Sequence, residues 1–168
     1  PGTFDVSLTV KNLTTGLTYT DVKRGLVVVA PGTLYVKKDN ASAAFPYADE
    51  NTAAASLADA LAAAGEGSAI RILPGRDLSG LTVNKGVAIV GVTGNPEDVV
   101  CKNQLTLGFP GISLSGVTIA GATSGNSANL LLTGDGCVVS NCVIRNHPAN
   151  NGNDISPVKT TGANSFMT

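Results

Sequence analysis

The second half of the chain holds few side chains that could carry out acid–base chemistry. No charged residue occurs between Lys102 and Asp135. The charged residues beyond this stretch are Asp135, Arg145, Asp154 and Lys159, and the one histidine of the chain is His147. Acid–base catalysis by carboxyl groups depends on such groups being placed together, and the aspartates of this set are not clustered in the sequence. We therefore predict no catalytic, cofactor-binding or metal-binding residue.

Two of these residues have simple interpretations as loop residues. Asp135 stands between Gly134 and Gly136, a setting typical of an exposed turn. His147 precedes Pro148, and an acid–base or ligand role for a single histidine would need a partner that the neighbouring sequence does not supply.

Two further short patterns predict loops rather than binding sites. Lys37 and Lys38 directly precede Asp39, which is typical of a solvated turn rather than of a basic patch. The stretch Gly65-Glu66-Gly67 predicts a loop rather than a phosphate-binding cradle.

The composition excludes several classes of protein. The chain has 168 residues, of which 14 % are charged and 43 % are hydrophobic, and its net charge is −1. A nucleic-acid-binding surface needs an excess of basic residues, which is absent here. No apolar run approaches the roughly 20 residues of a membrane helix. The apolar content favours a folded chain of one domain.

The N-terminus and the cysteines indicate the cellular compartment in which the chain is expected. The chain begins with Pro1 and shows no signal-peptide pattern, so we expect a removed initiator methionine and no secretion. Cys101, Cys137 and Cys142 are odd in number and lack metal-type spacing. They predict no disulfide framework.

The chain contains an internal repeat. Residues 105–119 (LTLGFPGISLSGVTI) and 130–144 (LLLTGDGCVVSNCVI) align without gaps at a spacing of 25, and residues 81–93 align with one gap. Two sets of residues mark corners between short alternating strands: Gly86, Gly111 and Gly136, and Gly91, Gly116 and Asn141. Glycine and asparagine are the types most at ease at positive φ.

Stacking these units into a coil would bury their apolar sides. Equivalent strands of successive turns would then pair in parallel, about 4.8 Å apart. The inward columns would be Val87, Ile112 and Cys137, and Val92, Val117 and Cys142. The last two cysteines are therefore expected to be small buried hydrophobic residues. Positions expected to face outward, all small and neutral, are Ser113, Ser115, Thr118, Ser124, Ser127 and Asn129.

A helix should precede the coil. Residues 49–64 are rich in alanine and leucine, begin with acidic residues and are followed by Gly65. Leu57 and Leu61 would share one face. Such a helix would cover the open N-terminal end of the coil, whose strand edges would otherwise be exposed.

The order of five segments along the chain is similar to that in a known family. In chain order the segments are Leu34-Tyr35-Val36, Phe45-Pro46, the predicted helix, Ile70-Arg71-Ile72-Leu73-Pro74-Gly75 and Gly86-Val87-Ala88-Ile89-Val90-Gly91. Over residues 34–146 the chain resembles the N-terminal part of the pectin-lyase-like superfamily. The resemblance implies an all-β fold: a short right-handed single-stranded parallel β-helix of about four turns with an N-terminal capping helix. It is closest in character to phage tailspikes and other virion β-helix proteins.

Residues 1–33 differ from the coil. Phe4, Val6, Leu8 and Val10 alternate with polar residues before a turn at residues 12–16. This pattern predicts a small β-hairpin, which either docks onto a partner as an attachment segment or adds strands to the flank of the coil. We thus expect an N-terminal β arm at 1–33, a lead-in with the capping helix at 34–66, and the β-helix at 67–168.

Three functions are compatible with this organisation. The first is a structural virion protein, either a phage tailspike N-terminal region or a capsid cement (decoration) protein. It would form a homotrimer and attach to a capsid or tail protein through residues 1–33. A host glycan is a further ligand compatible with this function. The second is a polysaccharide lyase or hydrolase, or its N-terminal fragment, although the N-T-D, D-D and G-H-G patterns of the family's pectinolytic hydrolases are missing. The third is a bacterial adhesin or carbohydrate-binding module at the cell surface or secreted. We favour the first function. It implies no enzymatic activity, no cofactor, and no binding to nucleic acid or to a membrane.

Overall fold

The computed structural model describes residues 2–29, 32–121, 128–145 and 157–168. It divides into two compact units, Pro1–Ala30 and Pro31–Thr168, and each has its own fold. His147 and Asp154, and the outward positions Ser124 and Ser127, lie outside the described residues.

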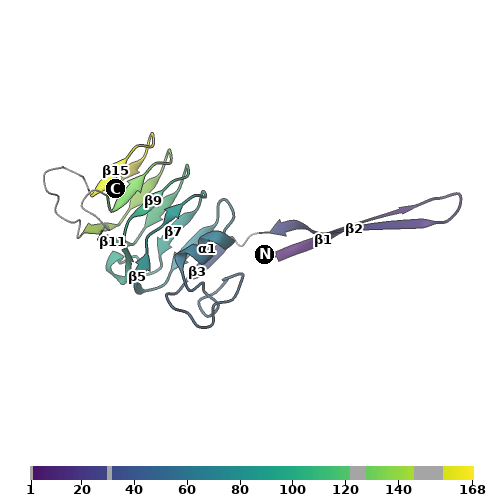
Figure 1. The fold of residues 1–168 in the computed structure, drawn as a ribbon, viewed down its shortest axis with the longest axis horizontal. Coiled ribbons are helices and arrows are strands. Elements are labelled where there is room, and N and C mark those ends of the chain that lie inside the picture. Colours follow the sequence, from purple (N-terminus) through teal and green to yellow (C-terminus); the bar gives the residue numbers. More distant parts are fainter. Residues whose placement is uncertain (1, 30–31, 122–127, 146–156) are drawn as a thin grey trace. The chain divides into compact units, whose positions relative to one another are not determined.

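The second unit is a coil of three parallel sheets (Figure 1). The six-stranded sheet contains, in spatial order, β16 (Phe166–Met167), β13 (Val138–Ser140), β10 (Ser113–Ser115), β7 (Ala88–Gly91), β4 (Ala69–Ile72) and β3 (Thr33–Val36). The second sheet contains β14 (Val143–Arg145), β11 (Thr118–Ala120), β8 (Val99–Lys102) and β5 (Gly75–Ser79). The third contains β15 (Val158–Thr160), β12 (Leu130–Leu132), β9 (Leu105–Leu107) and β6 (Thr82–Val83).

The chain visits these sheets in a fixed rotation, which makes a parallel β-helix. The four successive circuits are β4–β6, β7–β9, β10–β12 and β13–β15. Ser113 of β10 pairs with Ala88 of β7 and with Val138 of β13, which is the 25-residue spacing of the repeat. The predicted fold class is confirmed.

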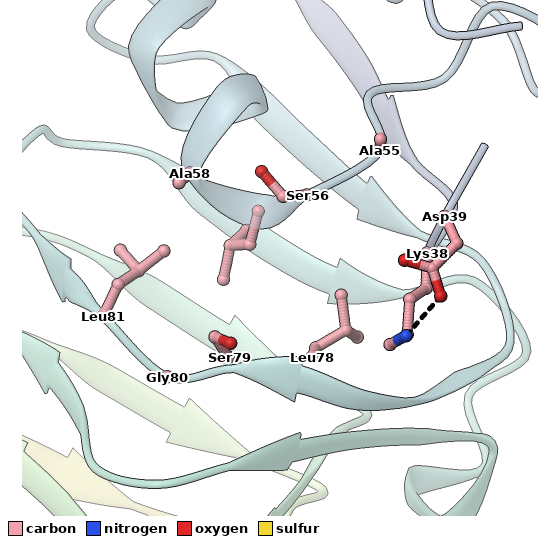
Figure 2. A pocket seen from close by; sticks show the side chains of 10 residues that line it. Lys38, Asp39, Ala55, Ser56, Ala58, Leu78, Ser79, Gly80 and Leu81 are labelled. Carbon is pink, nitrogen blue, oxygen red and sulfur yellow. Dashed lines mark hydrogen bonds and ion pairs between the residues drawn. The ribbon is translucent and has the colours of Figure 1, made fainter. Parts of the chain in front are cut away.

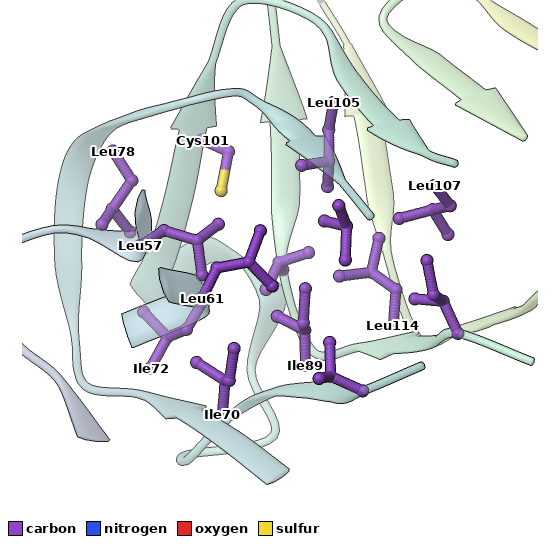
Figure 3. Close-up of a cluster of buried hydrophobic side chains, with 14 of the residues drawn as sticks. Leu57, Leu61, Ile70, Ile72, Leu78, Ile89, Cys101, Leu105, Leu107 and Leu114 are labelled. Atoms are coloured by element: carbon purple, nitrogen blue, oxygen red, sulfur yellow. The ribbon is translucent and has the colours of Figure 1, made fainter. Parts of the chain in front are cut away.

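The interior is filled by columns of apolar side chains. One buried column of the six-stranded sheet runs through Leu34, Ile70, Ile89, Leu114 and Val139, each paired in register with the next. Met167 pairs with Val139 at the end of this column and is exposed. The predicted column Val87, Ile112 and Cys137 is buried throughout. Figure 3 shows Leu57 and Leu61 of the helix among these side chains, close to Ile70 and Ile72.

The second predicted column, Val92, Val117 and Cys142, is wrong at Val92. The second sheet pairs Thr118 with Val100, so Val99, which is fully buried, takes the place that we expected for Val92. Val92 itself is half-buried. A short 3₁₀ helix, η1 (Pro96–Asp98), precedes β8 and lengthens this circuit.

The corner residues are confirmed in part. Gly111 and Gly136 have φ of +72° and +64°, and Gly116 and Asn141 have φ of +69° and +46°. Their counterparts in the first repeat, Gly86 and Gly91, are not among the positive-φ residues. Gly91 is required for a different reason: a Cβ there would lie 2.0 Å from the carbonyl oxygen of Gly116.

The helix is shorter than predicted. α1 spans Leu57–Ala63, and the Ser56 Oγ accepts a hydrogen bond from the Asp59 N–H at 3.1 Å. Residues 49–52 instead form a turn, because the Asp49 carboxylate accepts hydrogen bonds from the N–H groups of Asn51 and Thr52. Local side-chain bonding of this kind competes with helix formation.

A lysine fixes the C-terminal end of α1 to the coil. The Lys85 ammonium donates to the carbonyl oxygens of Leu61, Ala62 and Ala64 at 2.9, 3.1 and 2.7 Å. These carbonyls lie at the negative end of the helix, where a cation is favourable.

The coil continues further toward the C-terminus than the repeat indicated. Leu130 pairs with Val158, and Val138 pairs with Phe166, both at a spacing of 28. The gapless repeat seen in the sequence ends at residue 144, short of β15 and β16. The signal was missed because this circuit is three residues longer and its strands β15 and β16 carry polar and exposed residues.

The first unit is the predicted hairpin. β1 (Gly2–Lys11) pairs antiparallel with β2 (Thr18–Val29) in a two-stranded sheet of its own, and so it adds no strand to the sheets of the coil. The predicted turn is also confirmed: the Asn12 Oδ1 accepts from the N–H groups of Thr14 and Thr15, and Gly16 has φ of +74°.

Adjacent residues of β10 provide a test of the register. Leu114 is 1 % exposed and points inward, whereas Ser113 faces outward. We predict that Leu114→Asp lowers the free energy of unfolding by about 3–5 kcal/mol or prevents folding, since it buries an unpaired carboxylate. Ser113→Asp, the matched control, should cost less than about 1 kcal/mol. Urea unfolding followed by circular dichroism measures both, and equal effects of the two variants would contradict the register.

Candidate functional site

The hairpin exposes a row of large apolar side chains on one face. Val6, Leu8 and Val10 alternate along β1, so their side chains point to the same side of the sheet. Phe4 continues this alternation on β1 beyond a shift of the strand register between Phe4 and Val6. The exposed fractions of Phe4, Val6, Leu8 and Val10 are 52, 41, 65 and 55 %. Tyr19, 70 % exposed, pairs with Val10 and lies on the same side. We call these five residues the apolar face.

The opposite face of the hairpin is more polar. The hydroxyl groups of Thr9 and Thr20 form a hydrogen bond of 2.8 Å across the strands. Lys11 pairs with Thr18 in the next register position on this side, and Ser7 pairs with Val22. The hairpin is therefore an amphipathic ribbon.

Two charges border the apolar face. Asp21 pairs with Leu8, and Lys23 pairs with Val6, so both lie on the same side of the sheet as the apolar residues. Their carboxylate and ammonium groups form an ion pair of 3.1 Å. Sequence reasoning found the alternation on β1 but missed this pair, which is defined only by the strand register.

The tip of the hairpin is also apolar. Leu13 and Leu17, which flank the turn, are 92 and 72 % exposed. A two-stranded hairpin has no second layer in which to bury such side chains and is marginally stable alone. The apolar face and the tip are therefore candidate contact surfaces.

In the coil, the inserted segment around η1 brings distant charged residues together. Arg145 of β14 donates to the Oε1 of Glu97 at 2.9 Å and lies 2.8 Å from its Oε2. The hydroxyl of Thr118 donates to the Pro96 carbonyl at 2.9 Å. The Asn141 amide donates to the Gly94 carbonyl at 2.7 Å. These contacts fasten the segment across the second sheet, a structural role.

Two residues that we expected to face outward, Thr118 and Asn129, are buried. Thr118 is fully buried because the segment around η1 lies over it. Asn129 is also fully buried, and its amide donates to the Arg145 carbonyl at 2.8 Å. The prediction of a neutral exposed surface is wrong at these two positions, whereas Ser113 and Ser115 are half-buried.

The other titratable residues singled out from the sequence lie apart from one another. Asp135 is exposed at a corner, where its carboxylate accepts from the Ala163 N–H at 2.8 Å. Lys159 is exposed on β15. The Glu66 carboxylate accepts from the Gly86 N–H at 2.7 Å, so this loop residue joins the lead-in to the first repeat.

An open groove of about 480 Å³ lies between α1 and β5 (Figure 2). Lys38 and Asp39 stand at one end and Leu81 at the other, with Ser56 and Ser79 between them. Lys38 forms an ion pair with Asp39, and the Ser56 hydroxyl donates to Asp59 at 2.6 Å. The polar groups of the groove thus serve the turn and the helix cap.

The three cysteines are free thiols inside or at the margin of the core. Cys101 continues an inward column between Leu78 and Ile119. Burial, with a smaller effect of Cys142, raises its thiol pKa to about 12. Burial also raises the thiol pKa of Cys137 and of Cys142. All three are therefore protonated and poorly nucleophilic near neutral pH.

Neither a metal cluster nor a membrane helix occurs in the described part of the chain. Within residues 2–29, 32–121, 128–145 and 157–168, no three His, Cys, Asp or Glu side chains are grouped to hold a metal ion. Over the same residues, no helix has the length and apolar character needed to cross a membrane.

Comparison with known proteins adds no family. Protein-family models, curated proteins and solved structures give no significant match to the chain. What is shown is therefore the architecture: a parallel β-helix and an amphipathic N-terminal hairpin.

The thiol pKa shifts predict the stability of the coil in alkaline solution. A buried thiol stays protonated in the folded state, while the same thiol ionises near its ordinary value of 9.0 when the chain unfolds. Stability is therefore fully present below pH 9 and falls as the pH rises from about 9 toward 12. Urea midpoints at pH 8, 9 and 10.5 measure this decline.

A variant isolates the contribution of one thiol. Cys101→Ala should lower the midpoint at pH 8, because it removes buried volume. Its midpoint should nevertheless fall less steeply above pH 9 than that of the unmodified chain. Parallel pH profiles for the two proteins would show that Cys101 does not titrate as stated.

Proposed function

We propose that the protein is a structural component of a virion: a homotrimeric β-helix rod that attaches to a capsid or tail protein through its N-terminal hairpin. The observation that carries the proposal is the exposed apolar surface of the hairpin, at its tip and along one face. A surface of this kind on a separately folded ribbon is what an attachment element requires.

The tip is the part suited to the capsid or tail partner. Leu13 and Leu17 project from a turn that is held by the Asn12 side chain and by the hydrogen bond from the Gly16 N–H to the Asn12 carbonyl. A preformed turn loses little conformational entropy on binding. Two leucines at its end could fill an apolar pocket on a partner protein.

The coil supports the same proposal through its mechanical character. Every circuit pairs with the next one through three ladders of parallel hydrogen bonds, and the interior columns are almost entirely aliphatic. In a stack of this kind each circuit is stabilised by the circuits next to it, as a rod requires. Residues 34–146 resemble the pectin-lyase-like superfamily, which includes phage tailspikes as well as enzymes and adhesins, so the resemblance is compatible with such a role.

The proposal predicts that the chain is bound to virus particles. In a density gradient of particles released by cells that carry the gene, the chain should sediment with the particle band. Leu13→Asp should reduce the amount of chain per particle at least tenfold, because it would place a carboxylate in the apolar contact. Thr14→Asp, a change at an exposed residue of the same turn, is the matched control.

Either of two results would contradict attachment by the tip. One is recovery of the unmodified chain only from the soluble fraction. The other is an unchanged amount of the Leu13→Asp variant on particles, which would remove the tip from the attachment. Circular dichroism of each purified variant confirms that the coil is folded.

A further inference from the structure

We propose that the apolar face of the hairpin packs against the same face of two further copies of this chain around a threefold axis. The hairpin would then be the element that holds the trimer together. This inference rests on the proposed function, since it names the partner that covers one part of the attachment hairpin and leaves the tip free for the capsid or tail.

The shape of the apolar face favours three copies rather than two. Four of its five residues lie on β1, and β2 contributes Tyr19 before the polar pair begins. At the register positions of Val6 and Leu8 the apolar stripe is thus one strand wide. Three narrow stripes can meet along a common axis, with the outer strand of each ribbon left in contact with water.

A face-to-face pair would be much less favourable. Two ribbons stacked in that way cover both strands of each sheet. Asp21 and Lys23, which lie on the same side as Leu8 and Val6, would be buried with them. Burying two charges carries a large desolvation penalty. Around a threefold axis the pair can stay at the rim.

The charges at the rim also suit contacts between identical chains. Asp21 and Lys23 are adjacent on one strand face, are opposite in sign, and have side chains that are 44 and 67 % exposed. Identical ribbons in a ring therefore bring together borders of zero net charge, and each carboxylate can meet the ammonium group of a neighbouring copy. Such complementarity favours self-association over repulsion.

The strand alternation offers a matched pair of variants. Leu8→Lys places a charge in the centre of the apolar face, whereas Ser7→Lys places the same charge on the opposite face of the same strand. Tyr19→Lys and Thr20→Lys form a second such pair on β2. Within each pair the two variants share the strand and the introduced charge.

The experiment measures the solution mass of the full chain by light scattering on a sizing column. The unmodified chain, Ser7→Lys and Thr20→Lys should give a mass near three times 16.8 kDa. Leu8→Lys and Tyr19→Lys should give about one third of that mass, with the circular dichroism of the coil unchanged.

Three results would overturn the inference. A trimer that persists in Leu8→Lys and Tyr19→Lys would place the contact elsewhere, on the flanks of the coil, and would leave the proposed function intact. A dimeric unmodified chain would exclude the threefold arrangement. A monomer would exclude self-association of this face, while sedimentation of the chain with particles would decide independently whether the virion role survives.

Discussion

The coil depends on one constraint: each strand must pair in register with the strand one circuit away, so that like side chains stack on like positions. The constraint explains the aliphatic columns through Leu114 and Ile119 and the burial of Cys101 and Cys137 within them. It also explains the corners, where successive circuits approach so closely that a Cβ on Gly91 would collide with the backbone of Gly116. Because the same ladder joins every circuit, apolar surface buried in one turn is covered by the next.

The hairpin has no such cover of its own. Its two strands pair with each other on either side of a register shift between Phe4 and Val6, yet side chains such as Leu8 and Tyr19 remain exposed. The free energy available from covering them can be realised only in an assembly. This difference between a unit that covers itself and a unit that does not is the physical basis of the proposed role in attachment and trimer formation.

Much of the fold could be predicted from the sequence, because the 25-residue spacing places Ser113 beside Val138 and sets the direction of each side chain. The predictions failed at residues whose burial depends on contacts with segments distant in the sequence. The segment around η1 displaces Val92 from the core and covers Thr118, and neither effect is visible in a single repeat. Residues 49–52 look helical by composition, but the Asp49 side chain holds them in a turn. The ion pair of Asp21 and Lys23 beside the apolar face required the register of the hairpin.

The central claim is that the hairpin is stabilised by contacts between chains, whereas the coil is stabilised by contacts within one chain. Amide hydrogen exchange of the full chain at high and low protein concentration tests it most directly. The account predicts slow exchange in the coil at both concentrations, and slow exchange in β1 and β2 only at the high concentration. Equally fast exchange of the hairpin at both concentrations, with a protected coil, would contradict it.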